Sequence, residues 1–163
     1  MIESSYEKLD PGQRALVDAA ISVCANAYNP YSGFSVGAAL AAADKQIISG
    51  TNIENAAYGS TICAERSALA AGTAQGFTQF SAIAITGYGP KGPDASVVSP
   101  CGACRQMLFE ASQVSGLDLQ VLLASSNRSR VTITSIAELL PLGFGPKQLG
   151  VDISKYSSRG AGK

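Results

Sequence analysis

Three cysteines and one glutamate form the pattern with the clearest chemistry in this chain. Cys101 and Cys104 are separated by two residues, and Cys63 lies two residues before Glu65. Thiolate sulfur binds zinc, and three protein ligands leave the fourth tetrahedral position open for water, as in catalytic zinc sites. Zinc lowers the pKa of bound water to about 7, and a nearby carboxylate can accept and return the proton. We therefore predict a catalytic zinc site at these three cysteines, with Glu65 as the group that transfers protons.

Both cysteine motifs lie where a helix is expected to begin. Ser99 is placed to cap a predicted helix over 100–114, and Cys63 stands at the start of another, Ala-rich helix. Residues three apart on a helix share a face, so Cys101 and Cys104 can point at one ion. A helix N-terminus also favours a nearby negative charge by roughly 0.3–1 kcal/mol, which helps to keep sulfur as the thiolate.

Such a zinc site carries a net negative charge that nearby cationic side chains must compensate. Three thiolates on a dication leave a net charge of minus one, which opposes ionisation of the bound water. Arg66 and Arg105 flank the ligands, and guanidinium hydrogen bonds to sulfur would withdraw charge from the metal. An ordinary surface position is an equally plausible interpretation for Arg105. Cys24 lies in an apolar helical stripe, where we expect it to pack as a small hydrophobic residue.

Other interpretations of the pattern stay open at this point. A Cys-x-x-Cys pair also fits a redox centre, which would be expected just after a strand. The zinc could support folding alone, in a non-catalytic interaction module. Glu65 alone would most often be a solvated glutamate on a helix surface, and its proximity to Cys63 is what favours catalysis.

Composition restricts the class of protein. The 163 residues, 46% hydrophobic and 15% charged, suffice for one compact domain. Twelve basic residues balance twelve acidic ones, so we expect no long nucleic acid and no membrane as a partner. The longest nearly apolar run, 36–43, is too short to span a bilayer, and the first residues lack the pattern of a signal peptide. We therefore expect a cytoplasmic protein, where thiols stay reduced.

Apolar periodicity and turn residues predict the elements that must position the motifs. Helices are expected over 10–28, 62–74, 100–114 and 135–140, and strands over 34–43, 46–52, 81–86, 119–124 and 131–134. This order predicts an α/β protein of three layers, α/β/α, with a central mixed five-stranded sheet. We predict a single domain over 1–150, and a flexible tail over 151–163.

Five segments of the chain resemble the homotetrameric, zinc-dependent cytidine deaminases, in the order found there. They are 31–39 (YSGFSVGAA), 52–58 (NIENAAY), 62–66 (ICAER), 99–106 (SPCGACRQ) and 138–146, and the resemblance covers about 10–150. It implies a cytidine-deaminase-like fold, one zinc ion per subunit, and a homotetramer with active sites shared between subunits. It also implies hydrolytic deamination of cytidine and 2′-deoxycytidine to uridine and 2′-deoxyuridine, with release of ammonia, as in pyrimidine salvage.

The same resemblance assigns the residues around the substrate. Asn52 and Glu54 would hold the ribose 3′-hydroxyl, which suits alternate residues on one strand face. Phe34 would pack against the pyrimidine, although core packing is a competing interpretation. The backbone N–H of Ala64 would contact the base.

The chemistry and the assembly follow from the resemblance in the same way. Hydroxide on zinc would attack C4 of the base, while Glu65 protonates N3 and then the departing ammonia. Phe144 and Tyr58 would reach into the site of a neighbouring subunit. Arg66 would act beside the metal ligands.

Two other deaminase classes would use the same zinc chemistry. One acts on a modified cytidine or on another small aminated base or nucleoside, and a free-base enzyme has no use for the ribose-binding pair Asn52 and Glu54. The other acts on polynucleotides, which need a basic channel for phosphates. The zero net charge of this chain disfavours the second class.

Overall fold

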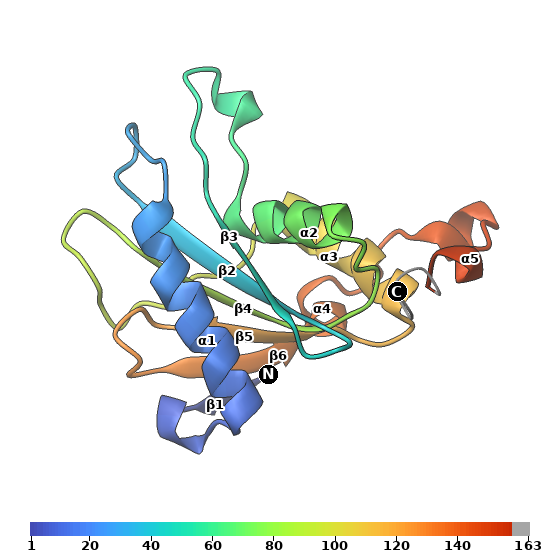
Figure 1. Ribbon diagram of the computed structural model, residues 1–163, viewed down its shortest axis with the longest axis horizontal. Coiled ribbons are helices and arrows are strands. Elements are labelled where there is room, and N and C mark those ends of the chain that lie inside the picture. Colours follow the sequence, from blue (N-terminus) through green and yellow to red (C-terminus); the bar gives the residue numbers. More distant parts are fainter. Residues whose placement is uncertain (158–163) are drawn as a thin grey trace.

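The computed structural model of the protein describes residues 1–157 as a mixed β-sheet with helices on both faces (Figure 1). The strands are β1 (Ile2–Ser4), β2 (Ser35–Ala42), β3 (Ile47–Thr51), β4 (Phe80–Tyr88), β5 (Gln120–Ala124) and β6 (Val131–Ser135). The helices are α1 (Pro11–Val23), α2 (Ala64–Ala74), α3 (Gly102–Ser115), α4 (Ile136–Leu139) and α5 (Ser154–Ser157). Short 3-10 turns lie at Tyr6–Lys8, Cys24–Asn26, Tyr58–Ser60 and Pro146–Leu149. Within the described residues, no helix is both long and apolar enough to cross a membrane.

The sheet has the order β1-β6-β5-β4-β2-β3. Strands β4 and β5 pair in parallel, and all other neighbours pair antiparallel, which confirms the predicted mixed sheet. The predicted number of strands was one too low, because β1 adds a sixth strand at the edge beside β6. Its Ile2 and Glu3 are exposed, so the three residues carry no alternation of buried and exposed side chains that the sequence could reveal.

Two hydrophobic cores lie on opposite faces of the sheet, as the alternation of side chains along a strand requires. On β4, Ile83 and Ile85 pack into the core beneath α2 and α3, while Ala84 packs into the core beneath α1. Helix α1 buries Leu16 and Val17 in this second core. The three-layer α/β/α arrangement is therefore confirmed.

Two glycines let helices approach the sheet closely. A Cβ atom at Gly37 on β2 would lie 2.0 Å from the carbonyl oxygen of Ala20 on α1. A Cβ atom at Gly50 on β3 would lie 2.2 Å from the backbone nitrogen of Ala68 on α2. The small residues of β2 and β3 thus set the distance between each helix and the sheet. Through Gly50, the sheet also fixes the position of α2 and of the motif at its N-terminus.

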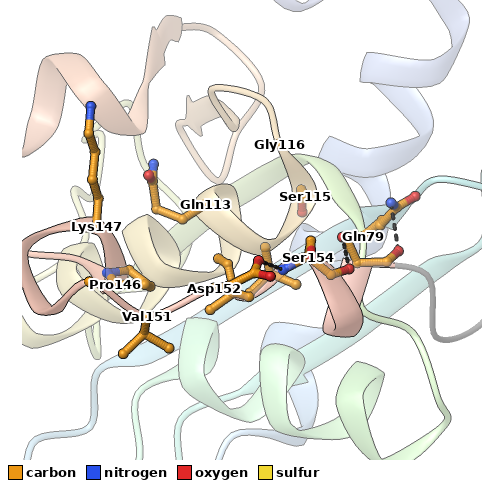
Figure 2. A pocket seen from close by; sticks show the side chains of 13 residues that line it. Gln79, Gln113, Ser115, Gly116, Pro146, Lys147, Val151, Asp152 and Ser154 are labelled. Carbon is orange, nitrogen blue, oxygen red and sulfur yellow. Dashed lines mark hydrogen bonds between the residues drawn. The ribbon is translucent and has the colours of Figure 1, made fainter.

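The C-terminal part of the described chain crosses the end of α3. A shallow cavity of about 750 Å³ lies there between Gln113 at the end of α3, Lys147 and the segment that leads to α5 (Figure 2). The side-chain amide of Gln79 donates a hydrogen bond to the carbonyl oxygen of Ser157, at 2.8 Å. Residues 158–163 lie outside the described chain. That 151–163 form a flexible tail, separate from a domain over 1–150, stays a prediction.

Candidate metal centre and active site

The three predicted ligands converge where α2 and α3 begin. Cys63 is the N-cap residue of α2, Cys101 is the N-cap residue of α3, and Cys104 is the third residue of α3. Their Sγ atoms all lie within 4.8 Å of one another. The prediction that Ser99 caps α3 is wrong, because the backbone stays extended through Cys101 and the helix begins at Gly102. The hydroxyl of Ser99 instead accepts a hydrogen bond from the guanidinium of Arg105, at 3.0 Å.

The donor set suits zinc. Zinc–sulfur bonds of about 2.3 Å in a tetrahedral site place neighbouring sulfurs roughly 3.8 Å apart, which this cluster can reach with small side-chain movements. Thiolate ligands also select zinc over hard cations such as Mg²⁺. Cys24 takes no part in the cluster. It is 1% exposed beside α1, where its thiol lies 3.5 Å from the carbonyl oxygen of Ala20, and it packs as the sequence predicted.

The three thiols differ in their tendency to ionise. Burial raises the pKa of Cys104, and the negative charge of Glu65 raises it further. Burial and the same carboxylate also raise the pKa of Cys63. Burial acts in the same direction at Cys101, but hydrogen bonds from the N–H and the thiol of Cys104, from the thiol of Cys63 and from the N–H of Ala103 outweigh it and lower the pKa of Cys101. Ionisation of any one of these groups opposes ionisation of its neighbours, so a divalent cation in the cluster would stabilise the anionic form of each thiol.

Glu65 is buried, contrary to the surface interpretation. It is the second residue of α2 and only 5% exposed, and burial raises the pKa of its carboxyl group. Ala64, the first residue of α2, is fully buried. Its N–H is one of the first four of the helix, which have no acceptor within the helix. A carboxyl group and a free N–H donor therefore stand directly beside the thiols.

The two arginines beside the ligands have different environments. Arg66 is exposed on α2. Arg105 directs three donors at oxygen atoms rather than at sulfur: Nε to the carbonyl of Pro100 at 2.8 Å, Nη1 to the carbonyl of Leu139 at 3.1 Å, and Nη2 to Ser99. The interpretation of Arg105 as an ordinary surface residue therefore does not hold, and neither does a direct guanidinium contact with sulfur.

Asn52 connects the end of β3 to the start of β2. Its side chain is 8% exposed; Oδ1 accepts a hydrogen bond from the N–H of Val36 at 2.8 Å, and Nδ2 donates to the carbonyl of Phe34 at 2.9 Å. An amide side chain has two donors and two acceptor sites. One donor and one acceptor site of Asn52 therefore remain for a ligand.

Glu54 is held by the loop that precedes β2. Its Oε2 accepts hydrogen bonds from the N–H groups of Tyr31 at 2.9 Å and Ser32 at 3.2 Å, and its Oε1 accepts one from the hydroxyl of Ser32 at 2.5 Å. The hydroxyl of Ser32 contributes most to lowering the pKa of Glu54. Ser32 was not predicted as a site residue, although it lies within the segment 31–39 that carries the family resemblance.

The three predicted aromatic contacts are all accessible. Phe34 is 36% exposed, and its ring lies beside Gly87 and Gly89, so core packing does not describe it. Tyr58 is 73% exposed on the loop between β3 and α2, and its ring meets that of Tyr31 edge to face with centroids 5.7 Å apart. This loop and the loop before β2 project beyond the sheet on the same side (Figure 1).

Phe144 lies after α4, on a segment that contacts α3. Its side chain is 58% exposed, and its carbonyl oxygen accepts a hydrogen bond from Gln106 at 2.7 Å. Leu142, two residues before Phe144, is fully exposed and has a positive φ of 60°. The segment therefore presents two apolar side chains to the outside of this chain.

A family model described as the cytidine and deoxycytidylate deaminase zinc-binding region matches residues 12–116, which include all three thiols and Glu65. The chain belongs to this family. As a member of the cytidine and deoxycytidylate deaminase family it is a zinc-dependent hydrolase, which confirms the predicted cofactor and class of enzyme. The redox interpretation and the purely structural zinc site are thereby displaced.

Known members of the family are similar over most of their length. A cytidine deaminase of Halalkalibacterium halodurans is 42% identical over 132 residues, which are 81% of this chain and 93% of that protein. The crystal structure of cytidine deaminase from Burkholderia pseudomallei is 41% identical, with a TM-score of 0.70, over 80% of this chain and 97% of the other. The enzyme from Mycobacterium tuberculosis is 34% identical, with a TM-score of 0.67, over 83% and 99% of the two chains. These likenesses confirm the predicted fold family.

Proposed function

We propose that the protein hydrolyses cytidine and 2′-deoxycytidine to uridine and 2′-deoxyuridine, with release of ammonia. The observation that carries the proposal is the buried carboxyl group of Glu65 beside three converging thiols. A deaminase needs an activated water and a group that moves protons onto the base and the leaving amine. The similar proteins named above are cytidine deaminases, which supports this substrate.

The chemical roles divide between the metal and the chain. Zinc held by Cys63, Cys101 and Cys104 would lower the pKa of a water in its open position. Glu65 would accept a proton from this water and deliver it to N3 of the base. It would then take a second proton from the hydroxyl group newly attached to C4 and deliver it to the departing amine, so that the carbonyl of the product forms as the C–N bond breaks. Its burial suits both steps, because a carboxyl group with a raised pKa holds and returns a proton more readily near neutral pH.

The substrate contacts follow from the polar groups that remain free. Ala64 offers its N–H to the base, and the partly exposed ring of Phe34 offers an apolar surface against the pyrimidine. Asn52 has one donor left, and Glu54 accepts three hydrogen bonds, which leaves about one of its four acceptor sites. One donor and one acceptor match a single hydroxyl group, which we assign to the ribose 3′-hydroxyl.

The accessible apolar side chains support an assembly with shared sites. Tyr58 and Phe144 project from the chain, and an apolar groove between α2 and α3 is lined by Leu69, Phe77 and Met107. We propose a homotetramer in which Tyr58 and Phe144 reach a neighbouring active site.

We also propose that the protein is a cytoplasmic enzyme of pyrimidine salvage with no nucleic acid or membrane partner. We assign to Arg66 the role of offsetting the negative charge of the ligands.

The first test compares three substrates on one zinc-quantified sample. Cytidine and 2′-deoxycytidine should lose ammonia, as followed by ultraviolet absorbance, whereas free cytosine should not react. Turnover of a modified cytidine alone would move the assignment to that substrate class. Equal turnover of cytosine and cytidine would remove the role of Asn52 and Glu54.

The second test replaces the proposed proton carrier. Glu65→Gln should retain zinc and fold but lose about 10²–10⁴ of the turnover rate, the usual contribution of general acid and base catalysis. The matched control is Glu7→Gln, an exposed carboxylate in the 3-10 turn before α1, which should behave as the unaltered enzyme. A Glu65→Gln enzyme that keeps its rate contradicts the mechanism.

A further inference from the structure

The side chain of Arg105 joins two segments that are far apart in sequence. Nε and Nη2 donate to Pro100 and Ser99, at 2.8 and 3.0 Å, and Nη1 donates to the carbonyl of Leu139 at 3.1 Å. Leu139 is the last residue of α4, so its carbonyl has no partner within that helix. The planar guanidinium can satisfy all three oxygens at once because its donors diverge in one plane.

Ser99, Pro100 and Cys101 form the turn that delivers one metal ligand (the ligand turn). Cys101 is an N-cap residue with extended backbone angles, φ −67° and ψ 167°, so only its carbonyl takes part in the hydrogen bonds of α3. The backbone N–H of Arg105 also donates to the carbonyl of Cys101, at 2.9 Å. Both the main chain and the side chain of Arg105 therefore hold the ligand turn against α3.

The segment that carries the carbonyl of Leu139 is itself fixed to α3. The next residue of the helix, Gln106, holds the carbonyl of Phe144 at 2.7 Å. A Cβ atom at Gly143 would lie 3.0 Å from the ring of Phe109, and one at Gly145 would lie 2.9 Å from it. The segment between Leu139 and Gly145 thus packs closely on α3, and the carbonyl of Leu139 is a stable anchor for Arg105.

We infer that Arg105 is a positioning residue that fixes Cys101 for zinc binding by tying the ligand turn to the end of α4. The inference rests on the zinc centre of the proposed function but not on its substrate. Lysine keeps the positive charge but offers a single ammonium group, which cannot bond three oxygens in the same plane. Arg105→Lys therefore removes the geometry and leaves the charge.

The test is zinc affinity, measured by competition of the purified holoprotein with a chromogenic chelator in the absence of any nucleoside. Arg105→Lys should weaken zinc binding about tenfold to a hundredfold, the usual effect of losing a residue that orients a ligand. Arg130→Lys is the control, because Arg130 is exposed and its contact is an ion pair with Glu3 at 3.4 Å. Unchanged zinc affinity in Arg105→Lys overturns the inference.

A second control separates positioning from general loosening of α3. Gly116→Ala strains the C-cap of α3, where φ is 69°, but lies at the opposite end of the helix from the ligand turn, so its zinc affinity should stay as in the unaltered protein. If Gly116→Ala weakens zinc as much as Arg105→Lys, a specific role for Arg105 is excluded. Cobalt(II) in place of zinc adds a spectroscopic signature: its thiolate bands should change in Arg105→Lys and stay the same in Gly116→Ala.

A milder variant keeps the inference testable if Arg105→Lys does not fold. Ser99→Ala removes one of the two side-chain contacts that hold the ligand turn, and should weaken zinc about threefold. Unchanged affinity in that variant would then overturn the inference. Because zinc is measured without substrate, a protein that fails to deaminate cytidine still reports on Arg105.

Discussion

Helix α1 begins with a complete set of stabilising side chains, whereas α2 and α3 each begin with a cysteine. The carboxylate of Asp10 accepts a hydrogen bond from the N–H of Gln13 at 2.9 Å, and the side chain of Gln13 accepts one from the N–H of Asp10 at 3.2 Å. Cys63 and Cys101 bring no side-chain oxygen to the same positions of α2 and α3. An oxygen at an N-cap stabilises a helix by about 1 kcal/mol relative to alanine.

The difference shows how the site is built at the expense of local stability. The start of α1 is fixed by its own sequence and carries no chemistry. The starts of α2 and α3 point their free N–H groups and thiols into one place, and they depend on a cation to hold them together. Stability of these two helix starts and activity should therefore be lost together, while α1 stays intact.

Removal of zinc should have the largest effect on the difference between α1 and the two helices that begin with a cysteine. Chelation should abolish activity and lower the free energy of unfolding by about 4 kcal/mol, the stabilisation from a ligand at about a thousand times its dissociation constant. Amide hydrogen exchange should increase most in the second turns of α2 and α3, whose N–H groups donate to the carbonyls of the first turn, and least in α1. Equal loss of protection in all three helices would show that zinc stabilises the whole fold rather than these two helix starts.

A paired substitution on the two faces of the sheet gives the next largest effect. Gly50→Ala and Gly37→Ala each place a Cβ atom within 2.2 Å of helix backbone, so both should destabilise the protein by about 3 kcal/mol or more. Gly50→Ala displaces α2 and should also weaken zinc binding, whereas Gly37→Ala displaces α1 and should leave the zinc content unchanged. Thermal unfolding and zinc analysis on the same samples measure both quantities, and zinc loss in Gly37→Ala would contradict this separation.

Loss of the cap of α1 should have the smallest effect. Asp10→Ala removes one side of the reciprocal cap and should lower the free energy of unfolding by about 1 kcal/mol, as measured by urea denaturation. Turnover and zinc affinity should not change, because α1 lies on the opposite face of the sheet from α2 and α3. A clear fall in turnover would mean that the two faces are coupled.

Much of the fold could be predicted because its signals are local. The apolar runs of β2 and β4 and the helical spacing in α1 are set by adjacent residues, and the predicted helices and strands correspond to observed ones. The predicted helix over 10–28 was too long, since the chain continues past α1 in a 3-10 turn at Cys24–Asn26 that keeps a similar apolar spacing. β1 was missed because its side chains are exposed at the edge of the sheet.

Residue types and spacing predicted the metal ligands and the proton carrier of the site, but not the contacts that position them. Three cysteines and a glutamate in this pattern specify a metal and a proton carrier, and the thiols do converge. The contacts that position them depend on residues distant in sequence. Arg105 bonds Leu139, thirty-four positions away, and Asn52 bonds the backbone of Phe34 and Val36 rather than presenting all of its amide to a ligand. Such partners are set by the tertiary fold, so no local pattern marks them.

The parallel pairing of β4 and β5 bears on the order of events during synthesis of the chain. Parallel neighbours need a crossover connection, and here that connection contains α3 with Cys101 and Cys104. Cys63 precedes β4, so the third thiol meets the other two only after β4 and the crossover have taken their places. A nascent chain that ends before α3 has one thiol of the three and cannot hold zinc as the finished protein does. Metal capture is therefore expected late in folding, after the central strands have paired.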